Sequence, residues 1–483
     1  MAMQSTRRIA LLICVLLLAA CASFPPNPPL AQYNPAAGYR FDQLERGANS
    51  DELFIIVSFS GGGTRAAALS FGVMEALRDT QIEWKQRKVS LLEEVDVISS
   101  VSGGSFPAAY YALYGARIFD EFPEKFLYRP IQSDLLKQLF LPYNLVRLAS
   151  PSFGRSDLAA EFYHREIFNG GTYADVIKRG QRPFIILNAT DMSRGTQFSF
   201  IQDQFDLLCS DLNGIPLARA AAASSAYPGG LTPLTFQNHA GSCQYQQPPW
   251  VALAAKDHSS RINPRRTARA EERLSLTDEG AGRRDYIHLT DGGVADNLGL
   301  RAPLTALTST NHPWSVLQMM NQKKVHKLVI ITVNAATDPA TQRDKTPNIP
   351  GLVDTLTAAA TVPLANYSFD TLELLTATVR TFNQEARLIE GCKKLAATKG
   401  EQCTLDIPTP HQVQWFPIQV AFEYIADSEE RNWFKNLPTS LELPHSAIDR
   451  LRAIGRRLLS EDPNFRKLIQ ALQGCLPDAQ QAC

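Results

Sequence analysis

The sequence of 483 residues has no excess of charge of either sign, because 48 lysines and arginines balance 48 aspartates and glutamates. This balance gives no reason to expect a nucleic-acid partner. Internal repeats are absent, and the only low-complexity stretch is a short proline-rich segment near the start. With 45% hydrophobic residues, the chain can bury one large core or two domains.

Metal and phosphate motifs are also missing. No CxxC motif and no cluster of cysteine and histidine has the spacing of zinc ligands, so we expect no structural zinc. The phosphate-loop pattern G-x-x-x-x-G-K-[ST] is absent. None of the eight histidines lies in a recognisable catalytic context. His288 precedes a candidate acid, Asp291, by three residues and would point to the opposite face of its strand.

The first 20 residues carry the features of a targeting segment. Arg7 and Arg8 precede an apolar run over residues 9–20, which is too short to span a bilayer as a helix. The run ends in Leu-Ala-Ala-Cys21 and resembles the lipobox of bacterial lipoproteins, in which the segment is cleaved before the cysteine and the thiol carries a diacylglyceryl group. An ordinary secretory signal with an incidental cysteine is the alternative.

This resemblance implies a location and a first division of the chain. Residues 1–20 would be a lipoprotein signal peptide, and residues 21–40 a lipidated Cys21 with a stiff proline-rich tether. Because Ala22, which is not acidic, follows the cysteine, lipoprotein sorting favours the outer membrane. We expect a bacterial envelope protein anchored by lipid and facing the periplasm.

The cysteine count fits an oxidising compartment. Six cysteines remain outside the signal and the anchor, and an even set in the periplasm predicts disulfides. Spacing alone does not fix the pairing, but proximity in sequence suggests Cys209–Cys243, Cys392–Cys403 and Cys475–Cys483.

Continuous apolar runs predict strands buried on both faces of a parallel sheet. We expect an α/β fold with three α/β/α layers, a mostly parallel central sheet and additional C-terminal helices. A catalytic domain would cover residues 41–345, with a polar insertion at 261–284, and a mainly helical part at 346–483 would pack on it. The predicted strands include residues 53–60, 183–190, 286–290 and 327–334. Residues 95–101 alternate β-branched and small residues and are also predicted as a short buried strand.

The apolar stretch over residues 135–148 allows three interpretations. It could be a lid over the substrate, a flap that contacts a membrane, or a core helix broken at Pro142. We favour the core helix.

Three turns carry the candidate chemistry. Ser102, followed by Gly103 and Gly104, lies where a predicted strand turns sharply into a helix, which is the placement of a nucleophile. The glycines at 61–63 follow another strand, and their amides could converge on an oxyanion. Asp291 ends a strand before two glycines, at the edge where open α/β sheets bind ligands. Read alone, each could be a helix cap or an ordinary turn.

Together the three turns resemble the patatin-like phospholipases, a family of acyl hydrolases with a Ser-Asp dyad. The resemblance extends from about Phe54 to Leu300. It implies Ser102 as nucleophile, Asp291 as its base, and Gly61, Gly62 and Gly63 as the oxyanion hole, supported by Arg65. Two positions depart from the family pattern, because Ser100 and Ala66 stand where glycines are usual.

The resemblance further implies hydrolysis of phospholipid or lysophospholipid acyl esters through an acyl-enzyme, without a metal or organic cofactor. Protein partners are not indicated. Two other functions stay open: a non-catalytic envelope lipoprotein that binds lipid or a partner, and an acyltransferase that passes the acyl group to an alcohol.

Overall fold

A computed structural model describes the chain from residue 22 to residue 474, apart from 48, 51, 85, 258–263, 278–283, 338–346, 401 and 404–412. The predicted signal peptide, the lipidation site Cys21 and the predicted Cys475–Cys483 pair lie outside the described residues.

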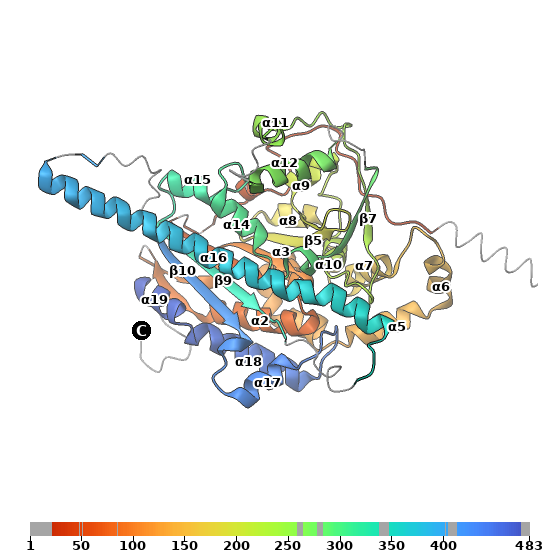
Figure 1. Ribbon diagram of the computed structural model, residues 1–483. Helices are drawn as coiled ribbons and strands as arrows, with labels where there is room; N and C mark the ends of the chain where they lie inside the picture. Colours follow the sequence, from red (N-terminus) through yellow and green to blue (C-terminus); the bar gives the residue numbers. More distant parts are fainter. Residues whose placement is uncertain are drawn as a thin grey trace, which may run out of the picture.

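A mixed sheet of eight strands forms the centre of the molecule, and helices flank it (Figure 1). Five neighbouring strands, in the order β10–β9–β1–β4–β5, are parallel, whereas β6, β7 and β8 are antiparallel. The predicted α/β fold with a mostly parallel sheet is thus confirmed. The strands are β1 (Leu53–Phe59), β4 (Val95–Val101), β5 (Phe184–Asp191), β6 (Thr196–Ser199), β7 (Leu234–Gln237), β8 (Tyr286–Asp291), β9 (Lys327–Asn334) and β10 (Gln414–Ala421), with a separate hairpin of β2 (Gln81–Trp84) and β3 (Arg87–Ser90).

The helices pack closely where small residues allow it. A Cβ atom added to Gly72 of α2 would lie 2.2 Å from the carbonyl oxygen of Arg452 in α18, so the two helices touch through their backbones. The longer helices are α2 (Gly63–Asp79), α3 (Ser105–Tyr114), α5 (Ile131–Leu139), α6 (Pro142–Leu148), α7 (Arg155–Glu166), α8 (Tyr173–Arg179), α10 (Leu217–Ser224), α11 (Pro249–Ala255), α12 (Pro264–Leu276), α14 (Arg301–Thr308), α15 (Val316–Asn321), α16 (Leu352–Lys399), α17 (Ser428–Lys435), α18 (His445–Glu461) and α19 (Pro463–Ala471).

Short helices complete the connections, and one of them begins at Ser102, directly after β4. These are η1 (Phe41–Gln43), η2 (Leu91–Glu94), η3 (Ser102–Gly104), η4 (Gly115–Arg117), α4 (Ile118–Phe122), η5 (Pro123–Leu127), α9 (Gln202–Phe205), η6 (Asp206–Leu208), α13 (Gly293–Asp296) and η8 (Phe422–Tyr424). Among the residues that the structure describes, no helix is both long enough and apolar enough to cross a bilayer.

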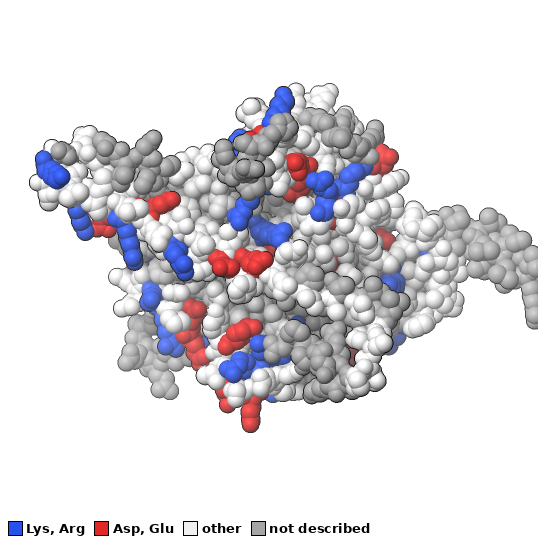
Figure 2. Space-filling model, viewed as in Figure 1, with Lys and Arg blue, Asp and Glu red and all other residues white. Residues whose placement is uncertain are grey.

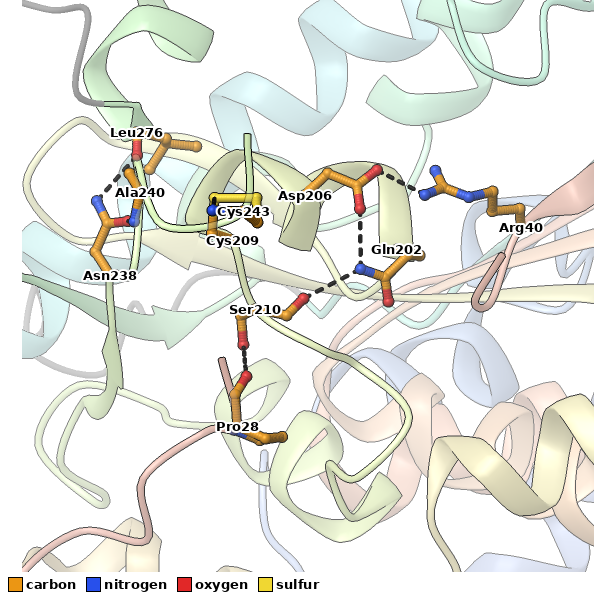
Figure 3. Close-up of a disulfide and its surroundings, with 10 residues drawn as sticks. All are labelled: Pro28, Arg40, Gln202, Asp206, Cys209, Ser210, Asn238, Ala240, Cys243 and Leu276. Atoms are coloured by element: carbon orange, nitrogen blue, oxygen red, sulfur yellow. Dashed lines mark hydrogen bonds and ion pairs between the residues drawn. A yellow bond between two sulfur atoms is a disulfide. The ribbon is translucent and has the colours of Figure 1, made fainter. Parts of the chain in front are cut away.

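The N-terminal segment, predicted as a stiff tether, is hydrogen-bonded to the body of the molecule. The side-chain amide of Asn27 donates to the hydroxyl of Ser210 at 2.8 Å, and the backbone of Leu30 donates to the carbonyl of Cys209 at 2.7 Å. Further along, the buried guanidinium of Arg40 pairs with Asp206 at 2.7 Å (Figure 3). The prolines favour an extended backbone, and the polar groups of the segment form hydrogen bonds and an ion pair with the rest of the protein. The segment therefore lies along the surface.

Two of the three suggested disulfides are confirmed. Cys209 bonds to Cys243 beside the N-terminal segment, and Cys392 bonds to Cys403 just past α16 (Figure 3 shows the first). The first bridge holds the turn at Cys209 on which the segment rests, because both Cys209 and Cys243 accept backbone hydrogen bonds from it.

The structure adds detail to two expectations about secondary structure and contradicts a third. The polar insertion at 261–284 contains α12, whose Ala270 and Leu276 are buried. The C-terminal part also contributes β10, which extends the central sheet beside β9. Finally, the stretch 135–148 is not a core helix, because five of its large apolar side chains are exposed: Leu136, Phe140, Leu141, Tyr143 and Leu145.

Candidate active site

Ser102 lies at a sharp turn between β4 and α3. Its φ of +50° is in the left-handed region, which side-chain-bearing residues rarely adopt. The turn needs the glycines that follow: a Cβ atom on Gly103 would lie 2.0 Å from the carbonyl oxygen of Gly63, and one on Gly104 would lie 2.7 Å from Phe59. The predicted strand-to-helix turn is therefore present, and it holds Ser102 in a strained conformation at the head of a helix.

A network of buried hydroxyls braces this turn from below. The hydroxyl of Ser224, at the end of α10, accepts the backbone N–H of Ser102 at 2.9 Å and donates to the carbonyl of Asn188 at 2.6 Å. Ser105 donates to Ser100 at 3.2 Å, and Ser100 donates to the carbonyl of Ile186. Ser100 stands where a glycine is usual, and its side chain is accommodated because neighbouring polar groups satisfy it.

The structure brings Ser102 and Asp291 together across 189 residues of sequence. The hydroxyl of Ser102 donates to Oδ2 of Asp291 at 2.8 Å. On β5, Asn188 pairs with Val101, and the next residue, Ala189, pairs with Asp291. The two side chains therefore flank the same point of β5.

The reason given for the position of Asp291 needs a correction. We expected Asp291 at the carboxyl end of a strand, on the edge where open α/β sheets bind ligands, but β8 is antiparallel to β5. Only its last three residues pair with β5, at the carboxyl end of that strand. Asp291 reaches the edge because β8 stops there.

Asp291 is buried, and burial raises its pKa from 3.8 to about 6. Hydrogen bonds from Ser102 and from the backbone N–H of Gly293, which donates to Oδ1 at 2.8 Å, stabilise the ionised form and limit the rise. A carboxylate with this pKa is ionised at neutral pH and is basic enough to accept a proton from a bound hydroxyl.

The glycine loop between β1 and α2 lies beside Ser102. Gly62 and Gly63 adopt φ values of +136° and +60°, which turn the chain sharply before the helix. Among the described residues, no acceptor is recorded for the amides of these two glycines, so they can donate to a ligand. The amide of Gly61 instead donates to the carbonyl of Asn297 at 3.0 Å. The assignment of Gly61 as an oxyanion donor is therefore corrected to a role in lining the cavity.

Arg65 ties this loop to two other parts of the chain. Its buried guanidinium donates to the carbonyl of Ala335 at 2.9 Å, to the carbonyl of Leu437 at 2.6 Å and to the hydroxyl of Thr439 at 3.2 Å. Burial lowers the pKa of Arg65 to about 10. All its recorded acceptors are uncharged, so it holds the loop through hydrogen bonds and leaves a positive charge beside the cavity.

Ser102 and Asp291 open into a cavity of about 480 Å³. One wall comes from α16, which Figure 1 shows crossing in front of the sheet, and another from β10 and η8. The side chains from α16 recur at the spacing of one helix face and are mainly apolar: Leu364, Ser368, Phe369 and Leu372. The wall from β10 and η8 is more polar and includes Gln419, Glu423 and Tyr424.

Sequence reasoning missed several contributors to this site. Ser224 and Asn188 brace the turn at Ser102, and Asn297 positions Gly61. All three lie in or next to the blocks that resemble the family, so a role was suggested, but their contacts are long-range. His288 is exposed and contacts Thr235 across β7 and β8, not Ser102. Within the described residues no group of three or more His, Cys, Asp or Glu side chains could hold a metal ion.

Comparison with solved structures finds distant likenesses. Human GIVD cytosolic phospholipase A2 is 11% identical, with a TM-score of 0.41; the match covers 88% of this chain and 60% of that one. The same human protein in complex with a methyl gamma-linolenyl fluorophosphonate inhibitor and terbium chloride is 12% identical, with a TM-score of 0.38. That match covers 88% of this chain and 59% of the human chain. VipD from Legionella pneumophila is 9% identical, with a TM-score of 0.29, 87% of this chain and 67% of that one covered.

The chain thus spans about three fifths of the length of the human phospholipase structures it matches. No curated protein sequence matches it. The family model described as patatin-like phospholipase matches residues 57–304, slightly more than half of the chain and the part that holds Ser102 and Asp291. The chain belongs to the patatin-like phospholipase family.

Proposed function

We propose that the chain is a lipid acyl-ester hydrolase of the phospholipase A or lysophospholipase type, with Ser102 as nucleophile and Asp291 as base. The hydrogen bond of 2.8 Å between these side chains, made inside a cavity, is the observation that carries the proposal. The family match supports a lipid ester as substrate, and the apolar face of α16 offers a surface for an acyl chain.

The proposed reaction uses groups of this chain alone. Asp291 accepts the proton of Ser102 as the serine oxygen attacks the ester carbonyl, and the amides of Gly62 and Gly63 donate to the oxyanion that forms. Asp291 then returns the proton to the departing alcohol, which leaves an acyl group on Ser102. Water, deprotonated by Asp291, attacks this acyl-enzyme, releases the fatty acid and restores the serine hydroxyl.

The test is the substitution Ser102→Ala, assayed with a fluorophosphonate probe and with a lipid ester. Labelling at Ser102 requires an activated hydroxyl, so we expect the parent to be labelled there and the variant to lose both labelling and fatty-acid release. Because removing the nucleophile of a serine hydrolase typically costs a factor of about 10⁶, the residual rate should fall to background.

A matched control is Ser193→Ala, which removes an exposed hydroxyl in the turn between β5 and β6. It should keep labelling and activity. An unlabelled parent would favour a non-catalytic lipid-binding role, and transfer of the acyl group to an added alcohol in preference to water would favour an acyltransferase. A folded Ser102→Ala variant with parental ester hydrolysis would refute the assignment.

We also propose that the protein is a bacterial lipoprotein, cleaved before Cys21, lipidated there and held on the outer membrane facing the periplasm. The lipobox-like sequence and the disulfides support an oxidising envelope compartment. Mass spectrometry of the mature N-terminal peptide should find a diacylglyceryl group on Cys21; an unmodified cysteine, or a chain that still carries residues 1–20, would contradict the proposal.

A further inference from the structure

The helices α5 and α6 form an apolar surface that no other part of the described chain covers. Among the described residues, it holds the largest group of exposed large apolar side chains that lie close together in the sequence. We call it the α5–α6 surface, and it comprises Leu136, Phe140, Leu141, Tyr143 and Leu145, which are 48%, 68%, 46%, 72% and 49% exposed. Exposed apolar side chains gathered in this way are typical of a surface that meets a partner.

The α5–α6 surface is held in shape by polar contacts behind it. The side-chain amide of Asn144 donates to the carbonyl of Gln138 at 2.8 Å and fixes α6 against the end of α5. Arg147 pairs with Glu161 on α7, and its guanidinium lies 5.3 Å from the ring centre of Tyr143. The apolar side chains are thus presented by a braced helix pair, which argues against a lid that would have to swing over the cavity.

The chain enters the described structure beside this surface. The carbonyl of Ala22 accepts hydrogen bonds from the hydroxyls of Ser150 at 2.5 Å and Ser152 at 3.3 Å, and Ser150 lies two residues past the end of α6. Phe24 then packs against Tyr286. Cys21 is bonded directly to Ala22, and consecutive Cα atoms lie about 3.8 Å apart, so a lipid on the Cys21 thiol would be attached close to a point fixed next to α6.

We propose that the α5–α6 surface docks on the phospholipid bilayer into which the Cys21 lipid inserts; this rests on the proposed lipidation. The two acyl chains of the lipid would be fixed beside an apolar helix pair, so the lipid and the helix pair would enter the same face of the membrane. Figure 2 shows the edge of the molecule around α6 as mostly uncharged, at the right of the view. Tyr143, with Arg147 over its ring, has the amphipathic character of side chains at a membrane interface.

Docking of this surface would bring the cavity close to the lipid. Gln132, at the start of α5, accepts from the hydroxyl of Ser440 at 2.8 Å, and the carbonyl of Ser440 accepts from the backbone N–H of Thr64, next to the glycine loop. Thr439, the residue before, lines the cavity. The loop at Thr439 and Ser440 therefore links the start of α5, the helix that carries Leu136, to the proposed active site.

The experiment places a tryptophan on the surface of the full chain, purified with its own N-terminus and reconstituted into phosphatidylcholine vesicles. Tyr143→Trp and, separately, Phe140→Trp report contact with the bilayer, and Leu388→Trp, exposed on α16, is the control. Figure 1 shows the end of α16 that carries Leu388 on the far side of the molecule from α6. The unsubstituted chain gives the baseline of the five native tryptophans.

In vesicles with brominated acyl chains, the added emission of Trp at 143 or 140 should fall by roughly half or more relative to unbrominated vesicles, because interfacial side chains reach the acyl boundary. The added emission at 388 should not change. Equal emission in both lipids for both surface variants overturns the proposal. A chain that dimerises without lipid through Phe140 and Tyr143 also overturns it, because a second copy then covers the surface.

Failure of this proposal can be told apart from failure of the proposed function. Quenching needs no catalysis, so it should persist in a Ser102→Ala background whether or not that variant hydrolyses esters. Mass spectrometry of the same preparation shows whether Cys21 carries lipid, so quenching is interpreted together with the state of the anchor.

Discussion

Asp291 must be ionised to accept the proton of Ser102, so its pKa sets the lower pH limit of the proposed reaction. Burial raises that pKa to about 6, against the lowering effect of the Ser102 and Gly293 hydrogen bonds. We predict that kcat/KM for a soluble ester is constant above about pH 7 and falls about tenfold per unit below about pH 5. A pH–rate profile measures this, and a limb near pH 4 would contradict the raised pKa of Asp291.

Asp291→Asn is the control for this profile, because it removes the titrating group and should abolish hydrolysis at every pH. It also has a predictable effect on stability. A carboxyl whose pKa is higher in the folded state than the ordinary 3.8 contributes stability below that value and loses it as pH rises through about 6. Asp291→Asn should therefore raise the free energy of unfolding by as much as about 3 kcal/mol at pH 8, and by well under about 1 kcal/mol at pH 4. Urea denaturation at both values checks the sign.

At the scale of single residues, the sequence predicted the catalytic candidates that lie in turns with a recognisable glycine pattern. Ser102 and Asp291 each stand before paired glycines, and such turns are legible without a structure. The contacts that complete the site were not predictable, because Ser224 and Asn297 act through a hydroxyl and a carbonyl on partners far away in sequence. The occupied amide of Gly61 was missed for the same reason.

At the scale of elements, continuous apolar runs identified the buried strands, whereas β10 was missed. β1 and β4 are buried at every position, and β1 shows the nearly continuous apolar run that is typical of a strand covered on both faces. β10 lies at the edge of the sheet, alternates partly exposed and buried side chains, and contains Pro417. Proline is compatible with an edge strand but weakens a strand prediction, which explains the error.

The helix pair α5 and α6 shows the opposite limit of such patterns. Its apolar residues predicted helix and Pro142 predicted the break between α5 and α6. The preference for a core position was wrong. Periodicity gives the apolar face of a helix but not what covers that face. Likewise, the charged residues of α12 concealed a helix, because few of its described side chains are buried.

At the scale of the whole molecule, the proposed active site is assembled from two parts of the chain. The family match at 57–304 contains Ser102, Asp291 and the glycine loop, but it ends before β9. The α16 face, β10 and the loop that holds Arg65 all lie beyond it and enclose the cavity. A resemblance confined to the family region therefore predicts the chemistry and leaves the shape of the substrate site to the C-terminal part.

This division predicts that α16 controls which acyl chains enter. Leu372 lines the cavity and is only partly buried against the core, so Leu372→Trp should fill space there without removing any hydrogen bond. We expect kcat/KM for a long-chain ester to fall at least about tenfold, since loss of chain contacts worth about 1.4 kcal/mol already gives that factor. A short-chain ester, which does not reach Leu372, should be hydrolysed at close to the parental rate.

Leu388→Trp is the matched control, because it makes the same change four turns further along α16 at an exposed position outside the cavity. Both esters should be hydrolysed by it as by the parent. Equal losses on long and short chains in Leu372→Trp would indicate damage to Ser102 or Asp291, not a blocked chain site. Unchanged activity on both would mean that the acyl chain leaves the dyad in another direction, and the apolar face of α16 would then need a different occupant.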